Sequence, residues 1–309
     1  MTDFLAVHSV HEFVFSVPDL EQARHFYTSF GLEVHDEGEG LALYAKDHPH
    51  RWARVLSGTA KRLLWVTYGV YAADMARFEQ HLAAMDIPHI VPCEKNSSGQ
   101  SGVWIQGPDQ LPLQILVAEK SSPSAPVPRV YPPTTGAAGR APNRSAIQKI
   151  APLHLSHILM FSANVLDAVQ FYTTVLGLRL SDSSGPVIGF MHSPHGSDHH
   201  LIALALSGGG GLHHSSWTVP SLDAVGLGSQ QMAQAGYAKG WGLGRHVLGS
   251  NYFRYVRDPW GSYAEYSFDI DFIPAGMEWP TADHPVEDSL YTWGPPPPDD
   301  FVTNFELTP

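Results

Sequence analysis

Strand-like and helix-like hydrophobic patterns occur in the same order in the two halves of the chain. A strand pattern over 11–17 is followed by apolar positions at helical spacing over 20–29 and then by a glycine turn. The run over 156–161 starts the same arrangement in the second half, where Phe171-Tyr172 matches Phe26-Tyr27. Each block predicts a strand, a helix capped by Asp or Asn, and a turn into the next strand.

Two further matches extend this internal repeat. Residues 65–68, which precede a predicted helix over about 72–85, match residues 215–218, which precede a predicted helix over about 221–235. Residues 107–116 match residues 258–267. Each half is therefore predicted to contain two βαβββ modules, four in all, which makes the fold an α+β fold of tandem modules.

A proline-rich stretch over 120–152 separates the halves and excludes a regular helix or a central strand there. We therefore expect four parts. They are a first domain over 1–119, a linker over 120–152, a second domain over 153–270 and a C-terminal tail over 271–309. The tail contains Trp279, Tyr291 and Trp293, which makes it a candidate lid.

Composition excludes several classes of function. The chain has 309 residues and a net charge of −12, with 30 acidic against 18 basic side chains, which argues against a nucleic-acid partner. Cys93 is the single cysteine, so neither an intramolecular disulfide nor a thiolate metal cluster can form. The N-terminus lacks the pattern of a signal peptide, and no apolar run is long enough for a membrane span. We expect a cytoplasmic protein without a membrane partner.

Potential metal ligands are concentrated in the second half. His157, the pair His213-His214 and Glu265 lie in three strand-like stretches, and two imidazoles with one carboxylate form the facial set that holds Fe(II) with open positions. A lone histidine in an apolar strand is more often a hydrogen-bonded core residue, and a lone strand glutamate is often exposed. The three-part pattern favours ligation. Because neighbours in a strand face opposite ways, only one of His213 and His214 is expected to face the metal.

The first half differs at the matching positions, where the repeat aligns Glu12, Leu64 and Gln114 with the three candidate ligands. Leu64 cannot bind a metal. The first half is therefore expected to keep the scaffold without a site, with Glu12 and Gln114 as satisfied polar residues.

Several motifs taken together resemble one family. They are His157 followed by 171–178, then 198–205, 212–214, 244–246, and Tyr255 ahead of 258–261 and Glu265. The chain resembles the type I extradiol ring-cleaving dioxygenases of the vicinal-oxygen-chelate superfamily, over nearly its whole length. The resemblance implies two open-barrel domains of the glyoxalase/bleomycin-resistance/dioxygenase type, the first of them vestigial.

The resemblance also implies roles for individual residues. It makes His157, His214 and Glu265 the iron ligands. The catalytic residues that it implies are a second-sphere acid–base histidine at His200, rather than its neighbour His199, and a further active-site pair at His246 and Tyr255. Taken alone, His246 could be a solvated loop residue and Tyr255 a core residue.

The implied reaction is extradiol cleavage of a catechol by O₂ at non-haem Fe(II), with Mn(II) as an alternative metal. The resemblance also leads us to expect a homo-oligomer of unstated size. No Lys or Arg follows Arg257, which favours a neutral substituted catechol over a carboxylate-bearing one. The rival functions are a glyoxalase-type lyase or isomerase, a non-enzymatic small-molecule binding protein, and an oxygenase acting on a keto acid.

Overall fold

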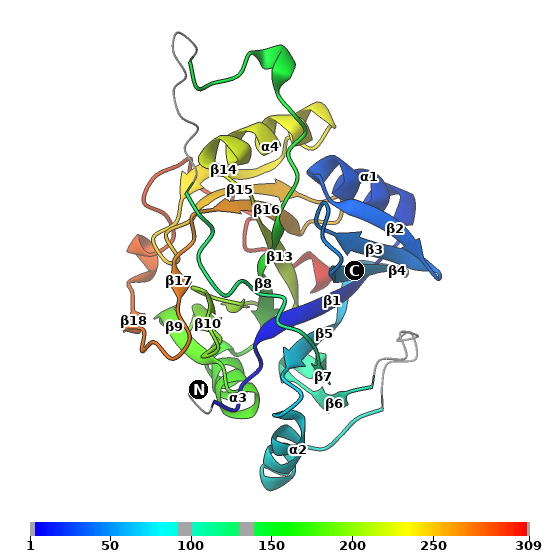
Figure 1. Ribbon diagram of the computed structural model, residues 1–309, viewed down its shortest axis with the longest axis vertical. Coiled ribbons are helices and arrows are strands. Elements are labelled where there is room, and N and C mark those ends of the chain that lie inside the picture. The colour runs from blue at the N-terminus through cyan, green and yellow to red at the C-terminus, as the bar shows by residue number, and fades with distance from the viewer. Residues whose placement is uncertain (1–3, 92–100, 130–138, 308–309) are drawn as a thin grey trace.

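The computed structural model describes residues 4–91, 101–129 and 139–307, which form two mixed sheets (Figure 1). The first sheet has seven strands in the order β2-β3-β4-β1-β5-β7-β6. Its strands are β1 (Ser9–Val17), β2 (Glu33–Glu37), β3 (Gly40–Tyr44), β4 (Arg51–Ser57), β5 (Arg62–Val70), β6 (Val103–Gln106) and β7 (Pro112–Val117). The helices α1 (Leu20–Phe30) and α2 (Met75–Ala84) belong to this half.

The second sheet has nine strands in the order β14-β15-β16-β13-β8-β12-β10-β9-β18. They are β8 (His154–Ser162), β9 (Arg179–Ser184), β10 (Ile188–His192), β12 (Ile202–Leu206), β13 (Gly211–Thr218), β14 (Gly240–Arg245), β15 (Tyr252–Arg257), β16 (Tyr263–Phe268) and β18 (Ala282–Asp283). The short strands β11 (Ser197–Asp198) and β17 (Phe272–Ile273) pair separately. The helices of this half are α3 (Val165–Leu176) and α4 (Leu222–Gln234).

The element order confirms the predicted α+β repeat. Helices α1 and α3 begin at Asp19 and Asn164, whose side chains accept hydrogen bonds from the first turn, and both end at glycines with positive φ. The first and fourth modules have the order βαβββ, and the third has the same order apart from the short extra strand β11. In the second module two described strands follow α2, and residues 92–100 lie outside the described part.

Strand register corrects one alignment of the repeat. Leu159 of β8 lies opposite His214, and its counterpart in β1, Val14, lies opposite Trp65. The residue that matches His214 is therefore Trp65, and the expected match with Leu64 is wrong by one position. The β-bulges of the two strand pairs lie at equivalent positions, with Leu64 of β5 and His213 of β13 as the residues left without a pairing partner in the strand beside them. Counting along the chain misses this register because the segments that join the paired strands differ in length between the halves. Since an indole cannot bind the metal either, the first half still lacks this ligand.

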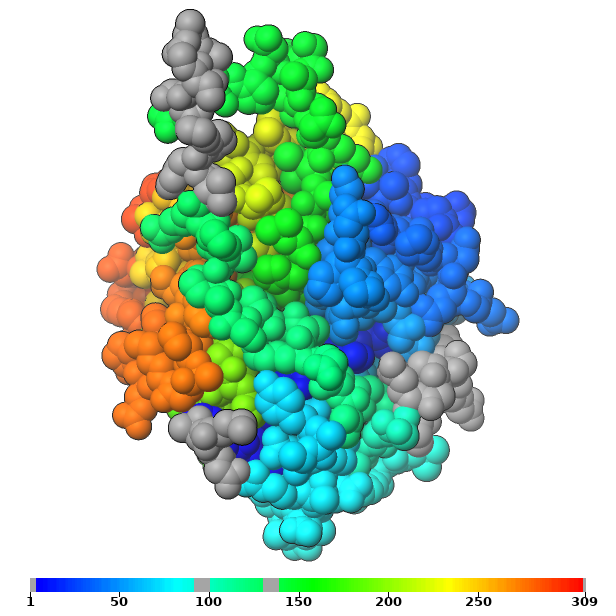
Figure 2. Space-filling model, viewed as in Figure 1, coloured from blue at the N-terminus to red at the C-terminus, as the bar shows by residue number. Residues whose placement is uncertain are grey.

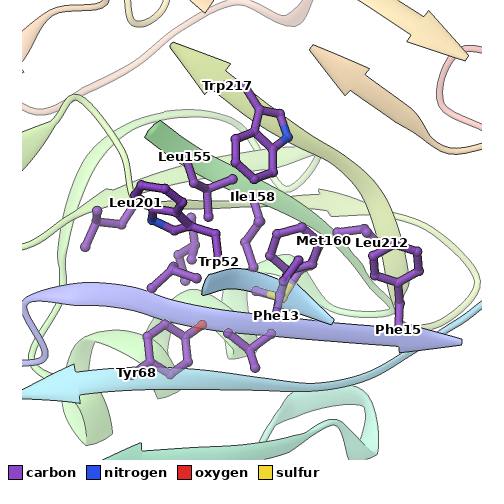
Figure 3. Close-up of a cluster of buried hydrophobic side chains, with 14 of the residues drawn as sticks. Phe13, Phe15, Trp52, Tyr68, Leu155, Ile158, Met160, Leu201, Leu212 and Trp217 are labelled. Carbon is purple, nitrogen blue, oxygen red and sulfur yellow. The ribbon is translucent and has the colours of Figure 1, made fainter. Parts of the chain in front are cut away.

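An apolar core joins the two halves. Figure 3 shows side chains from both sheets packed together, and their members include Phe13, Phe15, Trp52 and Tyr68 from the first half and Leu155, Ile158, Met160, Leu201, Leu212 and Trp217 from the second. Ile158 and Met160 of β8 belong to this shared core, whereas His157 and Leu159, which alternate with them, line a pocket on the other face.

The described parts of the linker run over the surface between the halves (Figure 2). Apart from a 3₁₀ turn over Arg144–Ala146, they carry no helix or strand. The linker is attached to α4, because Ile150 N–H donates to Gln231 Oε1 at 2.8 Å. None of the helices in the described ranges combines the length and apolar character needed to cross a membrane.

Candidate metal centre

Three adjacent strands bring His157, His214 and Glu265 together. They lie on β8, β13 and β16, and one potential ligand atom from each lies within 4.8 Å of the other two. His157 Nε2 is 3.5 Å and His214 Nε2 is 3.7 Å from Glu265 Oε2, and the two Nε2 atoms are 3.3 Å apart. All three side chains are buried. This is a two-histidine, one-carboxylate metal site.

Glu265 shows that a cation fits this site. Its Oε1 accepts a hydrogen bond from Asn251 Nδ2 at 3.2 Å, whereas its buried Oε2 has no hydrogen-bond partner among the described residues. An ionised, buried carboxylate oxygen without a donor is costly unless a cation lies beside it.

The hydrogen bonds of Ser156 orient His157 so that the lone pair of its Nε2 faces Glu265. Ser156 Oγ donates to Asp198 Oδ2 at 2.6 Å, so the same oxygen can accept from His157 Nδ1–H at 3.2 Å. This assignment leaves Nε2 unprotonated. Burial also lowers the pKa of His157, which keeps the imidazole neutral and able to bind a metal.

His214 is oriented in a similar way by its neighbour. His213 Nε2–H donates to the Phe301 carbonyl at 2.8 Å, so His213 Nδ1 accepts from His214 Nδ1–H at 2.7 Å. The lone pair of His214 Nε2 is therefore free. Burial lowers the pKa of His214 well below its ordinary value, which keeps this imidazole neutral as well.

Strict strand alternation is wrong for the pair His213-His214. Both side chains line the same pocket, because a β-bulge between Leu212 and His214 interrupts the pleat at His213. Of the two, only His214 belongs to the candidate ligand group, as expected, and His213 contacts it through the two Nδ1 atoms.

The pocket above the three candidate ligands is largely apolar. Its walls include Leu159, Ile188, Phe190, Ala205, Leu248, Leu290, Phe301 and Val302. His200, His246, Asn251, Tyr255 and Ser289 supply the other polar groups besides the histidines already described. No Lys or Arg is among the described residues that line it.

His200 lines the pocket beside His157, with ring centroids 4.0 Å apart. His199 Nε2–H donates to Asp182 Oδ2 at 2.8 Å, and His199 Nδ1 accepts from His200 Nδ1–H at 3.1 Å. Burial would raise the pKa of Asp182, but hydrogen bonds from His199 and others lower it. Burial lowers the pKa of His200 well below its ordinary value. His200 is thus a neutral imidazole with an unprotonated Nε2.

His246 and Tyr255 form a second polar pair. His246 Nδ1–H donates to the Leu290 carbonyl at 2.7 Å, so Nε2 accepts from the Tyr255 hydroxyl at 2.9 Å. Burial raises the pKa of Tyr255 well above its usual value, so the phenol stays protonated. A substrate hydroxyl beside Tyr255 could pass a proton through the phenol to His246.

The expected aromatic lid is wrong in its members. Trp279 instead donates to Asp182, Tyr291 packs on Trp241, and Trp293 packs near Tyr252. None of these three lines the pocket; the tail residues that do are Ser289, Leu290, Phe301 and Val302. The hydrophobic pattern of the tail did not predict which of its residues line the pocket, because their position depends on how the tail folds back.

In the first domain, two positions that match residues of the candidate metal centre and its pocket form an ion pair instead. The pairing of β1 with β4 and of β8 with β12 aligns Glu12 with His157 and Arg51 with His200. Arg51 Nε lies 2.5 Å from Glu12 Oε1, and Arg54 donates to Glu12 Oε2 at 2.9 Å. Thr67 Oγ1 donates to Gln114 Oε1 at 3.0 Å. The expectation that Glu12 and Gln114 are satisfied polar residues is confirmed.

Comparison with known proteins agrees with this site. The chain is 47% identical to metapyrocatechase 2 of Cupriavidus necator over 301 residues, which covers 97% of this chain and 93% of the relative. Residues 154–266 match the family described as "Glyoxalase/Bleomycin resistance protein/Dioxygenase superfamily".

Solved structures share the fold at low identity. A variant of homoprotocatechuate 2,3-dioxygenase from B. fuscum aligns with a TM-score of 0.77 at 17% identity, covering 98% of this chain and 83% of that one. The Mn(II)-bound glyoxalase from Novosphingobium aromaticivorans aligns with a TM-score of 0.75 at 22% identity, covering 95% and 93%. With the close relative and the buried two-histidine, one-glutamate site, the chain belongs to the type I extradiol dioxygenases of the glyoxalase/bleomycin resistance/dioxygenase superfamily.

Proposed function

We propose that this protein opens the ring of a neutral substituted catechol with O₂, at an Fe(II) ion held by His157, His214 and Glu265. The observation that carries the proposal is the buried Glu265 Oε2, which faces two unprotonated Nε2 atoms and has no hydrogen-bond partner in the described part of the chain. Fe(II) bound there supplies the redox chemistry that lets O₂ react with an aromatic ring. The name of the metapyrocatechase relative supports the catechol assignment.

Tyr255 and His246 are proposed to remove the first catechol proton. The phenol donates to His246 Nε2, so its oxygen retains a lone pair that can accept a hydrogen bond from a substrate hydroxyl. If the substrate proton moves to Tyr255 while the Tyr255 proton moves to His246, the positive charge ends on His246. The Glu265 carboxylate lies beside it, with Oε1 3.7 Å from His246 Nε2. The carboxylate stabilises that charge.

His200 is proposed to act on the opposite side of the bound ring. Its unprotonated Nε2 can accept a proton before it supplies one to the reacting oxygen. The low pKa that burial imposes makes the protonated form a strong acid, which suits rapid proton return. His199 and Asp182 hold the ring in the tautomer that this role requires.

The apolar pocket supports the substrate class. A ring substituent would lie against side chains such as Leu159, Ile188 and Ala205, and no cation among the described lining residues would balance a carboxylate. We further propose that 153–270 carries the chemistry, 1–119 is a scaffold, 120–152 is the linker, 271–309 covers the pocket, and the working form is a homo-oligomer.

The decisive experiment is anaerobic loading with Fe(II), followed by addition of 4-methylcatechol and air-saturated buffer. A yellow product that absorbs near the visible edge, formed with consumption of one O₂, supports extradiol cleavage. Parallel loading with Mn(II) identifies the working metal. A loaded protein that leaves every catechol intact, or that turns over only carboxylate-bearing catechols, contradicts the proposal. A protein that converts hemithioacetals instead belongs to the glyoxalase-type alternative.

A further inference from the structure

The last described residues fold back onto the strand that carries His214. We call residues 300–307 the C-terminal strap. Phe301 is 6% exposed and packs against Trp241, Tyr255 and Tyr263, with ring centroids 4.8, 5.0 and 5.1 Å apart. The strap therefore contributes to the wall of the pocket.

Two buried polar side chains anchor the strap. Glu306 accepts from Leu212 N–H at 2.9 Å and, through its other oxygen, from Leu63 N–H of the first domain at 2.8 Å. Asn304 Nδ2 donates to the carbonyls of Gly209 and Gly210, each at 3.0 Å. Glu306 and Asn304 are 6% and 7% exposed, so these contacts are made away from water, where an unpaired carboxylate would be costly.

The glycine-rich loop before β13 is shaped for this contact. A Cβ atom at Gly211 would lie 2.8 Å from Asn304 Oδ1 and 3.2 Å from the Glu306 carboxyl carbon. Any larger residue would push the strap away. Gly211, which no part of the proposed chemistry uses, thus has a physical reason in the docking of the strap, whereas a Cβ atom at Gly210 would meet Asp109 of the first domain, at 2.8 Å from its Cβ.

The strap reaches the metal centre through a short chain of hydrogen bonds. The Phe301 carbonyl accepts the Nε2 proton of His213, which forces His213 Nδ1 to accept from His214 and leaves His214 Nε2 without a proton. Glu306 holds Leu212, the residue directly before His213. Both contacts act on the same few residues of β13.

We propose that the C-terminal strap is a positioning element of the metal centre, in which the Phe301 carbonyl fixes His214 through His213 and Glu306 latches the strap to both domains. This inference rests on the metal site proposed above. His213 and Glu306 are positioning residues, since each acts through another group. The first domain gains a role as well, because its Leu63 amide holds one oxygen of the latch.

The test compares His213→Gln with His213→Leu. A glutamine amide can donate to the Phe301 carbonyl and accept from His214 Nδ1–H, whereas leucine can do neither. We expect the leucine variant to release Fe(II) to a chelator about 10–100-fold faster than wild type, and the glutamine variant to stay close to wild type. The absorption spectrum of the Co(II)-loaded protein should shift in the leucine variant alone.

Glu306→Ala tests the latch, with exposed Glu287→Ala as its matched control. Glu306→Ala should accelerate Fe(II) release and Glu287→Ala should not. Equal release from wild type, His213→Leu and Glu306→Ala overturns the inference, as does equal acceleration in the leucine and glutamine variants. If His213→Leu does not fold, Glu306→Ala decides by the same criterion. A wild-type protein that binds no Fe(II) contradicts the proposed function instead.

Discussion

Arg51 Nε lies 2.5 Å from Glu12 Oε1 in the first domain, at the two positions that His200 and His157 occupy in the second. The same backbone scaffold therefore supports two different solutions for a buried carboxylate. In the first domain guanidinium groups neutralise Glu12, and in the second a metal ion is the proposed partner of Glu265. The pair provides a matched comparison within one chain.

Glu12→Gln should lower the free energy of unfolding and leave iron content unchanged. Removal of the carboxylate leaves Arg51 and the buried Arg54 without their shared anion, and breaking a buried ion pair costs up to about 3–5 kcal/mol. Urea unfolding and iron per chain measure the two effects. Loss of iron without loss of stability would mean that the first domain takes part in metal binding.

Glu265→Gln should have the opposite effects: a loss of iron content without a loss of stability. The amide cannot replace the anionic ligand, so the purified variant should retain little iron after anaerobic loading. The metal-free variant should be at least as stable as metal-free wild type, since it no longer buries an unpartnered carboxylate oxygen. Normal iron content in this variant, or in His157→Ala, would exclude the proposed ligand set.

Tyr255→Phe and His246→Gln should each lower kcat by about 10²–10⁴-fold while iron content stays normal. The two groups form one proton path, so the double variant should be little slower than either single variant. Steady-state turnover of 4-methylcatechol by the iron-loaded proteins measures this. Full additivity of the two losses would show that the residues act independently.

Ala205→Leu should discriminate between substrates. Ala205 is buried in an apolar cluster with Leu159, and Ile188 and Phe190 pack against it. Added volume there should lower kcat/KM for a bulky alkylcatechol by about tenfold or more relative to unsubstituted catechol. An equal loss for both substrates would indicate that the substituent lies elsewhere in the pocket.

Acid should weaken the metal-free protein because several buried histidines take up protons when the chain unfolds. Burial lowers the pKa of His11, His50 and His154 to about 4. The same groups titrate near about 6.5 in the unfolded chain, so between these values the unfolded state binds more protons. The free energy of unfolding should therefore fall as pH decreases from about 6.5 towards 4. Urea titrations at several pH values test this, and a pH-independent result would contradict it.

Much of the fold could be predicted from local sequence patterns. The capped helices, the glycine turns and the repeat follow from short-range patterns such as Asp19 before α1 and Gly177 after α3. These features depend on backbone conformations that a few neighbouring residues decide. The candidate ligand types were also readable, because the second half has two histidines and a glutamate where the first half offers only one strong metal ligand, Glu12.

Long-range contacts decided the rest. Strand register aligned Trp65 instead of Leu64 with His214, and a β-bulge brought His213 to the same pocket as its neighbour. Phe301 and Val302 of the tail line the pocket because buried contacts such as that of Glu306 with Leu212 hold this part of the chain there. Strand register and tail docking depend on packing between segments that are distant in sequence, so residue order alone specified the candidate ligands and only the tertiary structure determined what orients them.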